Sequence, residues 1–355
     1  MGLAEPSMQT AQTVQTYESE IVSAQDTAIL DEPLLMETKS RYVMFPVEHP
    51  DIFQMYKNAS GSYWVADEIN FQQDLVDLEK LNENEMHFIT HVLAFFAASD
   101  GIVSENLSER FSKDVPKPEV RAFYAFQNAM EQVHSETYSL LIDTYVRDPR
   151  EKDRLFNAIQ NFPAIGEKAE WAKRWIEDKT ATFAQRLIAF AIVEGLFFSA
   201  SFCAIFWLRE RGLLPGLSFA NQLISRDESL HTEFACLLYS KLRHRVAQSD
   251  VHAMFREAVD IETRFITESI PCSMIGMNGD LMRQYIHYIA DRLLVMLGYD
   301  RIYRATNPFQ FVETACLQGK PSFFEVRSAE YAKASMVTEF LGADGGLSIN
   351  LSDDF

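Results

Sequence analysis

Two copies of one short pattern carry the residues best suited to chemistry in this chain. The pattern Glu-x-x-His occurs at Glu131 and His134 and again at Glu228 and His231, each time within an apolar stretch of helical periodicity. Residues i and i+3 share one face of an α-helix, so each copy can direct a carboxylate and an imidazole at the same point. The repeated pattern therefore indicates a metal site.

Two lone acids on other apolar stretches complete the candidate ligand set. Asp100 follows the apolar run at residues 93–99, and Glu194 is the only charged residue between residues 188 and 208. Buried carboxylates are costly unless they are paired or bound to a cation, and four together would repel one another. Two divalent metals would balance four carboxylates, and oxygen and imidazole ligands suit iron or manganese. Helix bundles build dinuclear sites from one Glu on each of two helices and Glu-x-x-His on two others, so only Asp100 departs from that pattern.

Each of these observations also has a purely structural interpretation. Glu and His are common on solvated helix faces, so a single Glu-x-x-His is a weak signal, and a structural helical protein would leave these groups in solvent. Residues 188–208 are long and apolar enough for a membrane span, but Glu194 lies in their middle and a polar helix end follows at residues 209–212. We therefore expect a buried helix and no membrane association, with Glu194 as the functional exception.

Helix start and stop signals place the candidate ligands on an all-α scaffold. Asn82 and Glu85 resemble a capping box that opens a helix to about residue 110, and Pro118 opens another to about residue 145. Further helices are predicted at about 166–178, from Thr182 to about 211, after Pro215 to about 244, and at about 247–268 and 279–297. No run alternates with the two-residue period of a sheet.

Length, composition and charge favour one large helical domain between two terminal segments. The chain has 355 residues, 47% of them hydrophobic, and its net charge of −19 argues against a nucleic-acid-binding surface. Its four cysteines show no C-x-x-C spacing, which fits a reducing compartment. We expect a mobile acidic segment at residues 1–40, the helical domain at 41–340, and a flexible tail at 341–355. A tail ending in Phe355 can dock into a partner's groove, although an inert frayed end is the more common case.

A tyrosine beside the candidate ligands suggests what the metal would do. Tyr138 follows His134 by four residues and Glu131 by seven, so its side chain shares their helix face, within about 6 Å of His134 between Cβ atoms. A buried tyrosine is ordinarily part of a core, with its hydroxyl hydrogen-bonded nearby. Beside a dimetal centre that activates dioxygen, the phenol is instead a candidate electron donor, and a ligand carboxylate is a candidate acceptor of its proton.

These residues lie within segments that have a recognisable family pattern. The chain resembles the small, radical-bearing subunit of class I ribonucleotide reductase, of the eukaryotic type, in the segments HVLAFFAASDGIVSENL, FQNAMEQVHSETYSLLIDTY, VEGLFFSASFCAIFWL, ISRDESLHTEFA, IGMN and GYDRIYRATNPF. The acidic tail ending in Phe355 belongs to the same resemblance, which runs from about residue 41 to 355. It implies a ferritin-like helical bundle with a dinuclear metal site in its core.

The resemblance also assigns roles to residues around the metal site. It implies two iron ions per chain, with manganese as the other possible metal, held by Asp100, Glu131, His134, Glu194, Glu228 and His231. Asp is the family's usual residue at the position of Asp100. Tyr138 would hold a stable radical after dioxygen oxidises the diferrous centre. Phe198, Phe202 and Ile224 would form the apolar pocket around it, which excludes water and reductants.

A second group of residues would carry the oxidising equivalent away. The resemblance implies this relay role for Trp64, Asp227 and Tyr331. Asp227 is also reasonable on physical grounds, because a metal-bound histidine such as His134 commonly donates its other N–H to a carboxylate. Spacing alone would leave Trp64 and Tyr331 as ordinary aromatic residues.

The sequence lacks two features that a chain needs in order to bind and reduce a nucleotide itself. No cysteine pair is spaced as a reducing dithiol, and no glycine-rich phosphate loop is present. We therefore do not expect this chain to bind or reduce the nucleotide itself. The resemblance implies a cytoplasmic homodimer that supplies a radical to a separate large catalytic subunit, docked through the Phe355 tail, for reduction of ribonucleoside diphosphates. The alternative is a ferritin-like di-iron oxidase or iron-storage protein. It would use the same six ligands but would have no need of Trp64, Asp227, Tyr331 or a docking tail.

Overall fold

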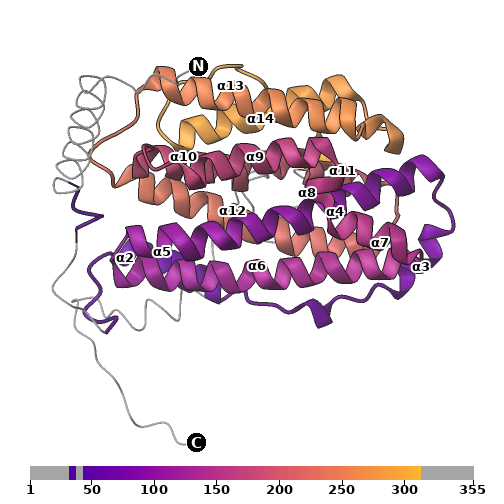
Figure 1. The fold of residues 1–355 in the computed structure, drawn as a ribbon, viewed down its shortest axis with the longest axis horizontal. Helices are drawn as coiled ribbons and strands as arrows, with labels where there is room; N and C mark the ends of the chain where they lie inside the picture. The colour runs from indigo at the N-terminus through magenta and orange to yellow at the C-terminus, as the bar shows by residue number, and fades with distance from the viewer. Residues whose placement is uncertain (1–31, 37–42, 313–355) are drawn as a thin grey trace, which may run out of the picture.

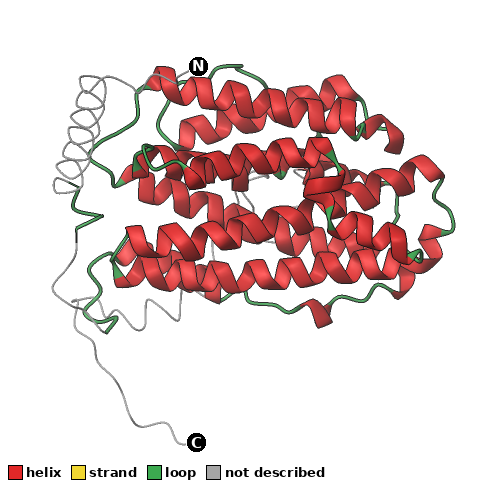
Figure 2. Cartoon of the chain, in the orientation of Figure 1, coloured by secondary structure: helices red, strands yellow, loops and turns green. Residues whose placement is uncertain are grey.

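The described part of the chain, residues 32–36 and 43–312 of this computed structural model, consists of helices and loops. No strand occurs within these residues, which confirms the expected all-α fold (Figure 2). The longer helices are α2 (Pro50–Ser60), α4 (Glu83–Asn106), α6 (Pro118–Tyr145), α9 (Pro163–Glu177), α10 (Phe183–Ile192), α11 (Ser199–Glu210), α12 (Pro215–Ser240), α13 (Gln248–Arg264) and α14 (Gly279–Met296). Shorter helices are α3 (Gln72–Leu78), α5 (Ser112–Asp114), α7 (Pro149–Phe156) and α8 (Ala158–Asn161), with 3-10 turns η1 (Ala66–Glu68) and η5 (Cys272–Ile275).

The long helices lie roughly parallel to one another in layers (Figure 1). Helices α13 and α14 pack side by side along one edge, and α4 and α6 pack side by side toward the opposite edge. Helices α9 to α12 lie between these two pairs, where α12 packs against both α10 and α11. The core is therefore enclosed by helices on both sides, and the candidate ligands lie on the α4–α6 pair and on the helices between the two pairs.

Local sequence signals explain where several helices begin. The predicted capping box at α4 is confirmed, because Glu85 N–H donates to Asn82 Oδ1 at 3.0 Å and Asn82 N–H donates to Glu85 Oε2 at 2.9 Å. Pro118 and Pro215 are the first residues of α6 and α12, as expected for a residue without a backbone donor. Helix α2 and the short helices α3, α7 and α8 were not expected from the pattern.

Three helices contain a π-helical segment that the periodicity did not predict. These segments are η2 (Leu107–Phe111), η3 (Val193–Phe197) and η4 (Phe265–Ser269). The helix predicted from Thr182 to about residue 211 is therefore divided into α10, η3 and α11. A π turn inserts one residue into the helical register and is frequent at functional sites, and η3 contains the candidate ligand Glu194.

The start of α12 is fixed by a distant carboxylate. Asp74 of α3 is fully buried, and its two oxygens accept the N–H groups of Gly216 at 2.7 Å and Leu217 at 2.8 Å. Tyr145 at the end of α6 donates its hydroxyl to Asp74 at 2.5 Å. A Cβ atom at Gly216 would lie 2.7 Å from Asp74 Oδ2 and 2.8 Å from the Asn70 carbonyl oxygen, so only glycine allows this approach.

Two helical stretches are long and apolar enough to cross a membrane, judged by length and composition alone. They are Glu83–Asn106 and Phe183–Glu210, and the most apolar parts of them are 67% and 100% buried inside the protein. Such burial is typical of core helices. The expectation that residues 188–208 form a buried helix is confirmed.

The predicted domain boundaries near residues 40 and 340 fall outside the described residues and remain predictions.

Candidate metal centre

The six candidate ligands come from four helical stretches and converge inside the protein. Asp100 lies on α4, Glu131 and His134 on α6, Glu194 on η3, and Glu228 and His231 on α12. None of the six residues exposes more than 2% of its surface. The structure therefore brings together every ligand that the sequence predicted.

The ligand atoms form two groups that share one carboxylate. Asp100, Glu131 and His134 form one group, and Glu131, Glu194, Glu228 and His231 form the other; within each group the ligand atoms lie within 4.8 Å of one another. Because Glu131 belongs to both groups, it occupies the position of a bridge between two ions. This arrangement fits a dinuclear site.

The two histidines face the carboxylates with the same ring nitrogen. His134 Nδ1 lies 3.0 Å from Glu228 Oε1 and 3.4 Å from Glu131 Oε2. His231 Nδ1 lies 3.1 Å from both Glu131 Oε1 and Glu228 Oε2. Each Nδ1 is thus directed at carboxylate oxygens, and it can bind a cation placed between them.

The closely spaced, buried carboxylates of the cluster favour the binding of cations. Burial raises the pKa of Asp100 and of Glu194 well above their usual values, and neighbouring carboxylates raise both further. Burial would lower the pKa of His231, but Glu228 and Glu131 raise it to about 9. Burial would raise the pKa of Glu228, but His231 and His134 hold it well below its usual range. Cations bound at the centre would neutralise the same carboxylates.

The buried polar atoms of the candidate ligands that lack hydrogen-bond partners show whether these residues are suited to metal ions. Within the described residues, no hydrogen-bond partner is present for the buried atoms Asp100 Oδ2, Glu131 Oε1 and Oε2, Glu194 Oε2, Glu228 Oε1 and His134 Nδ1. Buried polar atoms are usually paired, so a cluster of unpaired oxygen and nitrogen atoms indicates groups reserved for a ligand. A set of carboxylates and imidazoles without thiolates suits iron or manganese.

Two side chains that the sequence analysis did not single out orient residues of the site, one a candidate ligand and the other the predicted relay residue Asp227. Gln127 donates its Nε2 to Glu194 Oε1 at 2.8 Å and is itself buried. It lies four residues before Glu131 on α6, and this spacing on the ligand-bearing face was the signal that could have identified it. The second is Arg226, which donates to Asp227 Oδ1 at 3.0 Å and to the Ser62 carbonyl oxygen at 2.8 Å.

The predicted relay residues Trp64 and Asp227 lie next to the metal centre. Trp64 donates its Nε1–H to Asp227 Oδ2 at 2.7 Å, and the same oxygen lies 3.2 Å from His134 Nε2. The Trp64 and His134 rings are stacked with centroids 5.9 Å apart. An unbroken series of contacts therefore leads from the candidate ligand His134 through Asp227 to Trp64. The third predicted relay residue, Tyr331, and the predicted docking residue Phe355 lie outside the described residues.

Tyr138 is buried against an aromatic cluster. Its hydroxyl has no hydrogen-bond partner in the part of the chain that the structure describes, and its ring stacks on Phe96 with centroids 4.7 Å apart and an interplanar angle of 8°. Phe96 in turn contacts the rings of Phe198 and Phe202 at 5.8 Å and 5.0 Å. Phe96 was missed in the sequence, although it precedes Asp100 by four residues on α4.

The surroundings of Tyr138 disfavour its ionised form. Burial raises the pKa of Tyr138 well above its usual value, and the nearby charge of Asp100 raises it further. The predicted pocket residues Phe198, Phe202 and Ile224 each expose only 1% of their surface. The phenol is thus held neutral in apolar surroundings beside a candidate ligand.

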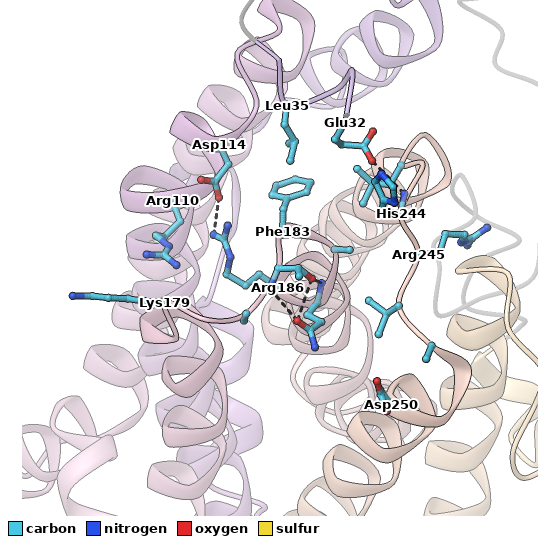
Figure 3. A pocket seen from close by; sticks show the side chains of 17 residues that line it. Glu32, Leu35, Arg110, Asp114, Lys179, Phe183, Arg186, His244, Arg245 and Asp250 are labelled. Carbon is cyan, nitrogen blue, oxygen red and sulfur yellow. Dashed lines mark hydrogen bonds and ion pairs between the residues drawn. The ribbon is translucent and has the colours of Figure 1, made fainter. Parts of the chain in front are cut away.

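A large cavity lies away from this cluster. It has a volume of about 460 Å³ and is lined by residues that include Leu35, Arg110, Phe183, Arg186 and His244 (Figure 3). Arg186 forms an ion pair with Asp114 at 2.6 Å across one wall. None of the six candidate ligands lines this cavity. This cavity is therefore separate from the candidate metal site.

Comparisons of the sequence with known proteins identify one family. Residues 41–308 match the family model described as ribonucleotide reductase, small chain. The ribonucleoside-diphosphate reductase small chain of Neurospora crassa is 56% identical over 90% of this chain and 78% of its own length. Subunit M2 of the human ribonucleoside-diphosphate reductase is 54% identical over 87% of this chain and 79% of its own length.

Solved structures show the same fold. The structure of the Rnr4 homodimer of Saccharomyces cerevisiae ribonucleotide reductase matches with a TM-score of 0.76 and 36% identity, covering 84% of this chain and 95% of that one. The ribonucleotide reductase R2 subunit of Clostridium botulinum matches with a TM-score of 0.71 at 20% identity, covering 79% of this chain and 89% of that one. This second likeness concerns the fold alone.

Proposed function

This chain belongs to the ribonucleotide reductase small-chain family, and we propose that it generates and stores a tyrosyl radical for the reduction of ribonucleoside diphosphates. The observation that carries the proposal is the pair of ligand groups sharing Glu131, with Tyr138 buried beside them. We place the reduction itself on a separate large subunit, because no cysteine pair in the sequence has the C-x-x-C spacing of a reducing dithiol.

The cofactor in this proposal is a pair of iron ions in each chain. Glu131 would bridge the two ions, with Asp100, His134, Glu194, Glu228 and His231 as the remaining ligands. When bound, the two ferrous ions would each give one electron to dioxygen, which is the oxidant; Tyr138 would give another electron, and an external one-electron reductant would give the last. Manganese has the same preference for oxygen and imidazole ligands and is the other metal that the site would accept.

Tyr138 must lose a proton together with its electron. Its raised pKa means that the phenol keeps its proton until the electron is removed, after which the phenol becomes strongly acidic. The charge of Asp100 acts on Tyr138, and this ligand carboxylate is the candidate acceptor of the proton. Phe96, Phe198 and Phe202 exclude water and external reductants, which lengthens the life of the radical.

The radical has to leave its buried position during turnover. The contacts from His134 through Asp227 to Trp64 support a route toward the surface, and Tyr331 is proposed as its next member. We propose further that the chain works as a cytoplasmic homodimer and that the tail ending in Phe355 binds the large subunit. An iron-storage protein or simple oxidase would have no use for the Asp227–Trp64 contact, so no observation favours that alternative.

The test is the variant Tyr138→Phe, loaded with ferrous iron under anaerobic conditions and then exposed to oxygen. We expect two iron ions per chain by elemental analysis, no organic radical signal by electron paramagnetic resonance, and no activity with the large subunit. A normal radical spectrum from the variant would refute the role of Tyr138. A wild-type protein that binds no transition metal would refute the metal centre itself.

A further inference from the structure

A second buried cluster of charged residues lies outside the metal centre. Lys168 of α9 and Glu262 of α13 expose 2% and 0% of their surfaces, and Lys168 Nζ lies 2.5 Å from Glu262 Oε2. Burial lowers the pKa of Lys168 to about 8 and raises the pKa of Glu262 to about 7. Burying two charges costs free energy that their attraction often does not recover, so such a pair needs a reason beyond stability.

The ion pair packs against the aromatic cluster that surrounds Tyr138. Lys168 Nζ lies 3.7 Å from the centroid of the Phe95 ring and 3.8 Å from that of Phe265. Phe95 precedes Phe96, which stacks on Tyr138, and the Phe95 ring lies 5.8 Å from that of Phe198. The ammonium group is therefore separated from the radical pocket by a single layer of rings.

The ion pair also reaches the backbone where η3 gives way to α11. Lys168 Nζ donates to the carbonyl oxygen of Phe197, the last residue of η3, at 2.7 Å. Glu262 in turn holds the Lys168 ammonium group through their ion pair.

We propose that Lys168 and Glu262 are positioning residues that hold this break in one geometry and so fix Glu194 for metal binding. Glu194 lies three residues before Phe197 within the same π turn, so a shift of the Phe197 carbonyl would move the Glu194 backbone with it. Phe198, which belongs to the aromatic cluster around Tyr138, lies inside the break itself. The inference rests on the proposed dinuclear metal site and adds residues from α9 and α13 to those that shape it.

A purely stabilising role makes a different prediction. Replacement of a buried ion pair by apolar residues of similar volume is often neutral or stabilising. If Lys168 and Glu262 only filled the core, the double variant K168M/E262L would match the wild type in every respect. If they hold the junction between η3 and α11 in one geometry, that variant would keep its stability, but Glu194 would no longer be held in its metal-binding position.

The experiment compares metal binding in variants of the full chain. Metal-free wild type, K168M/E262L, E262Q and a control are titrated anaerobically with ferrous iron, and the melting temperature of each metal-free protein is measured. The control is E167Q/R264Q, because Glu167 and Arg264 form an exposed ion pair between the same two helices. E262Q keeps a side chain of nearly the same volume with an oxygen that can accept from Lys168, and it leaves the donation from Lys168 to Phe197 possible.

We expect two ions per chain in the wild type, in E262Q and in the control. K168M/E262L should melt close to the wild type but bind one of its two ions about tenfold more weakly, the lower range for loss of an outer-shell contact. Its radical should also decay faster after oxygen is added. Should K168M/E262L fail to fold, K168M/E262M replaces it with the same criteria.

Two results would overturn the inference. One is binding of both ions by K168M/E262L with wild-type affinity and wild-type radical lifetime. The other is an equal loss of affinity in E167Q/R264Q, since any link between α9 and α13 would then suffice. A wild type that binds no metal refutes the proposed function instead, so the two failures are distinguishable.

Discussion

Removal of the Phe96 ring should shorten the life of the Tyr138 radical. Phe96 exposes 1% of its surface and stacks on Tyr138 and Phe202 with centroids 4.7 Å and 5.0 Å away. Phe96→Ala would leave a cavity directly beside the phenol, with room for water or a small reductant. We expect the radical to decay faster on the order of tenfold, because exclusion of such molecules is what protects it.

The same substitution also costs stability, and this cost has to be separated from the effect on the radical. Truncation of a buried Phe to Ala typically destabilises by about 3–5 kcal/mol. At about 2 °C per kcal/mol for a larger domain, the melting temperature should fall by about 6–10 °C. Phe88→Ala is the matched control, since Phe88 is fully buried on the same helix, two turns before Phe96.

The assay is electron paramagnetic resonance of the radical as a function of time at a temperature where all variants are folded. Both variants should melt at lower temperatures, but only Phe96→Ala should lose its radical early. Equal lifetimes in Phe96→Ala and the wild type would refute the protective role of the ring. Equal shortening in Phe88→Ala would show that general loosening of the core, rather than access to Tyr138, controls the decay.

Three further predictions concern other parts of the molecule. Deletion of the tail from Leu347 onward should abolish binding to the large subunit and leave the radical intact; unchanged affinity in a pull-down or calorimetric titration would contradict the docking role. Asp227→Asn should weaken metal binding or activity by about 10-fold or more, because it removes the charge facing His134, and an unaltered iron titration and turnover would argue against that role. Burial and a neighbouring histidine lower the pKa of His91 to about 4, so the unfolded chain binds a proton between pH 4 and 6.5 that the folded chain does not. Acidification over this range should therefore lower the free energy of unfolding of the metal-free protein. His91→Gln should remove up to about 2.5 kcal/mol of that loss. The variant should then show a smaller fall in melting temperature than the wild type between pH 6.5 and 4.5.

The ligands could be predicted from sequence because helical spacing links residue type to direction. Glu131 and His134 share a face of α6, and Glu228 and His231 share a face of α12, whatever the helices pack against. The apolar surroundings of Glu194 and Asp100 then identified the other two carboxylates. Capping and proline signals located the starts of α4, α6 and α12 for equally local reasons.

The parts that could not be predicted depend on contacts between segments distant in sequence. Gln127 and Phe96 carry no motif, and only the folded structure shows that they touch Glu194 and Tyr138. The π turn η3 adds one residue to a helix that reads as continuous, because periodicity averages over many turns. The pairing of Lys168 with a glutamate 94 positions later, from 168 to 262, leaves no trace in local spacing.

The contact between Gly216 and Asp74 has a consequence for how tolerant the chain is to mutation. Gly216 lies twelve positions before Glu228 on α12, or about 18 Å along the helix axis. A side chain at position 216 would collide with Asp74 and with the Asn70 carbonyl oxygen, so these groups or the start of α12 would have to shift. A shift of α12 would also displace Asp227, Glu228 and His231, which lie on the same helix. An intact metal site thus depends on glycine at position 216 as well as on the carboxylates and imidazoles. Substitutions at this position should therefore be as rare among relatives as substitutions at the ligands.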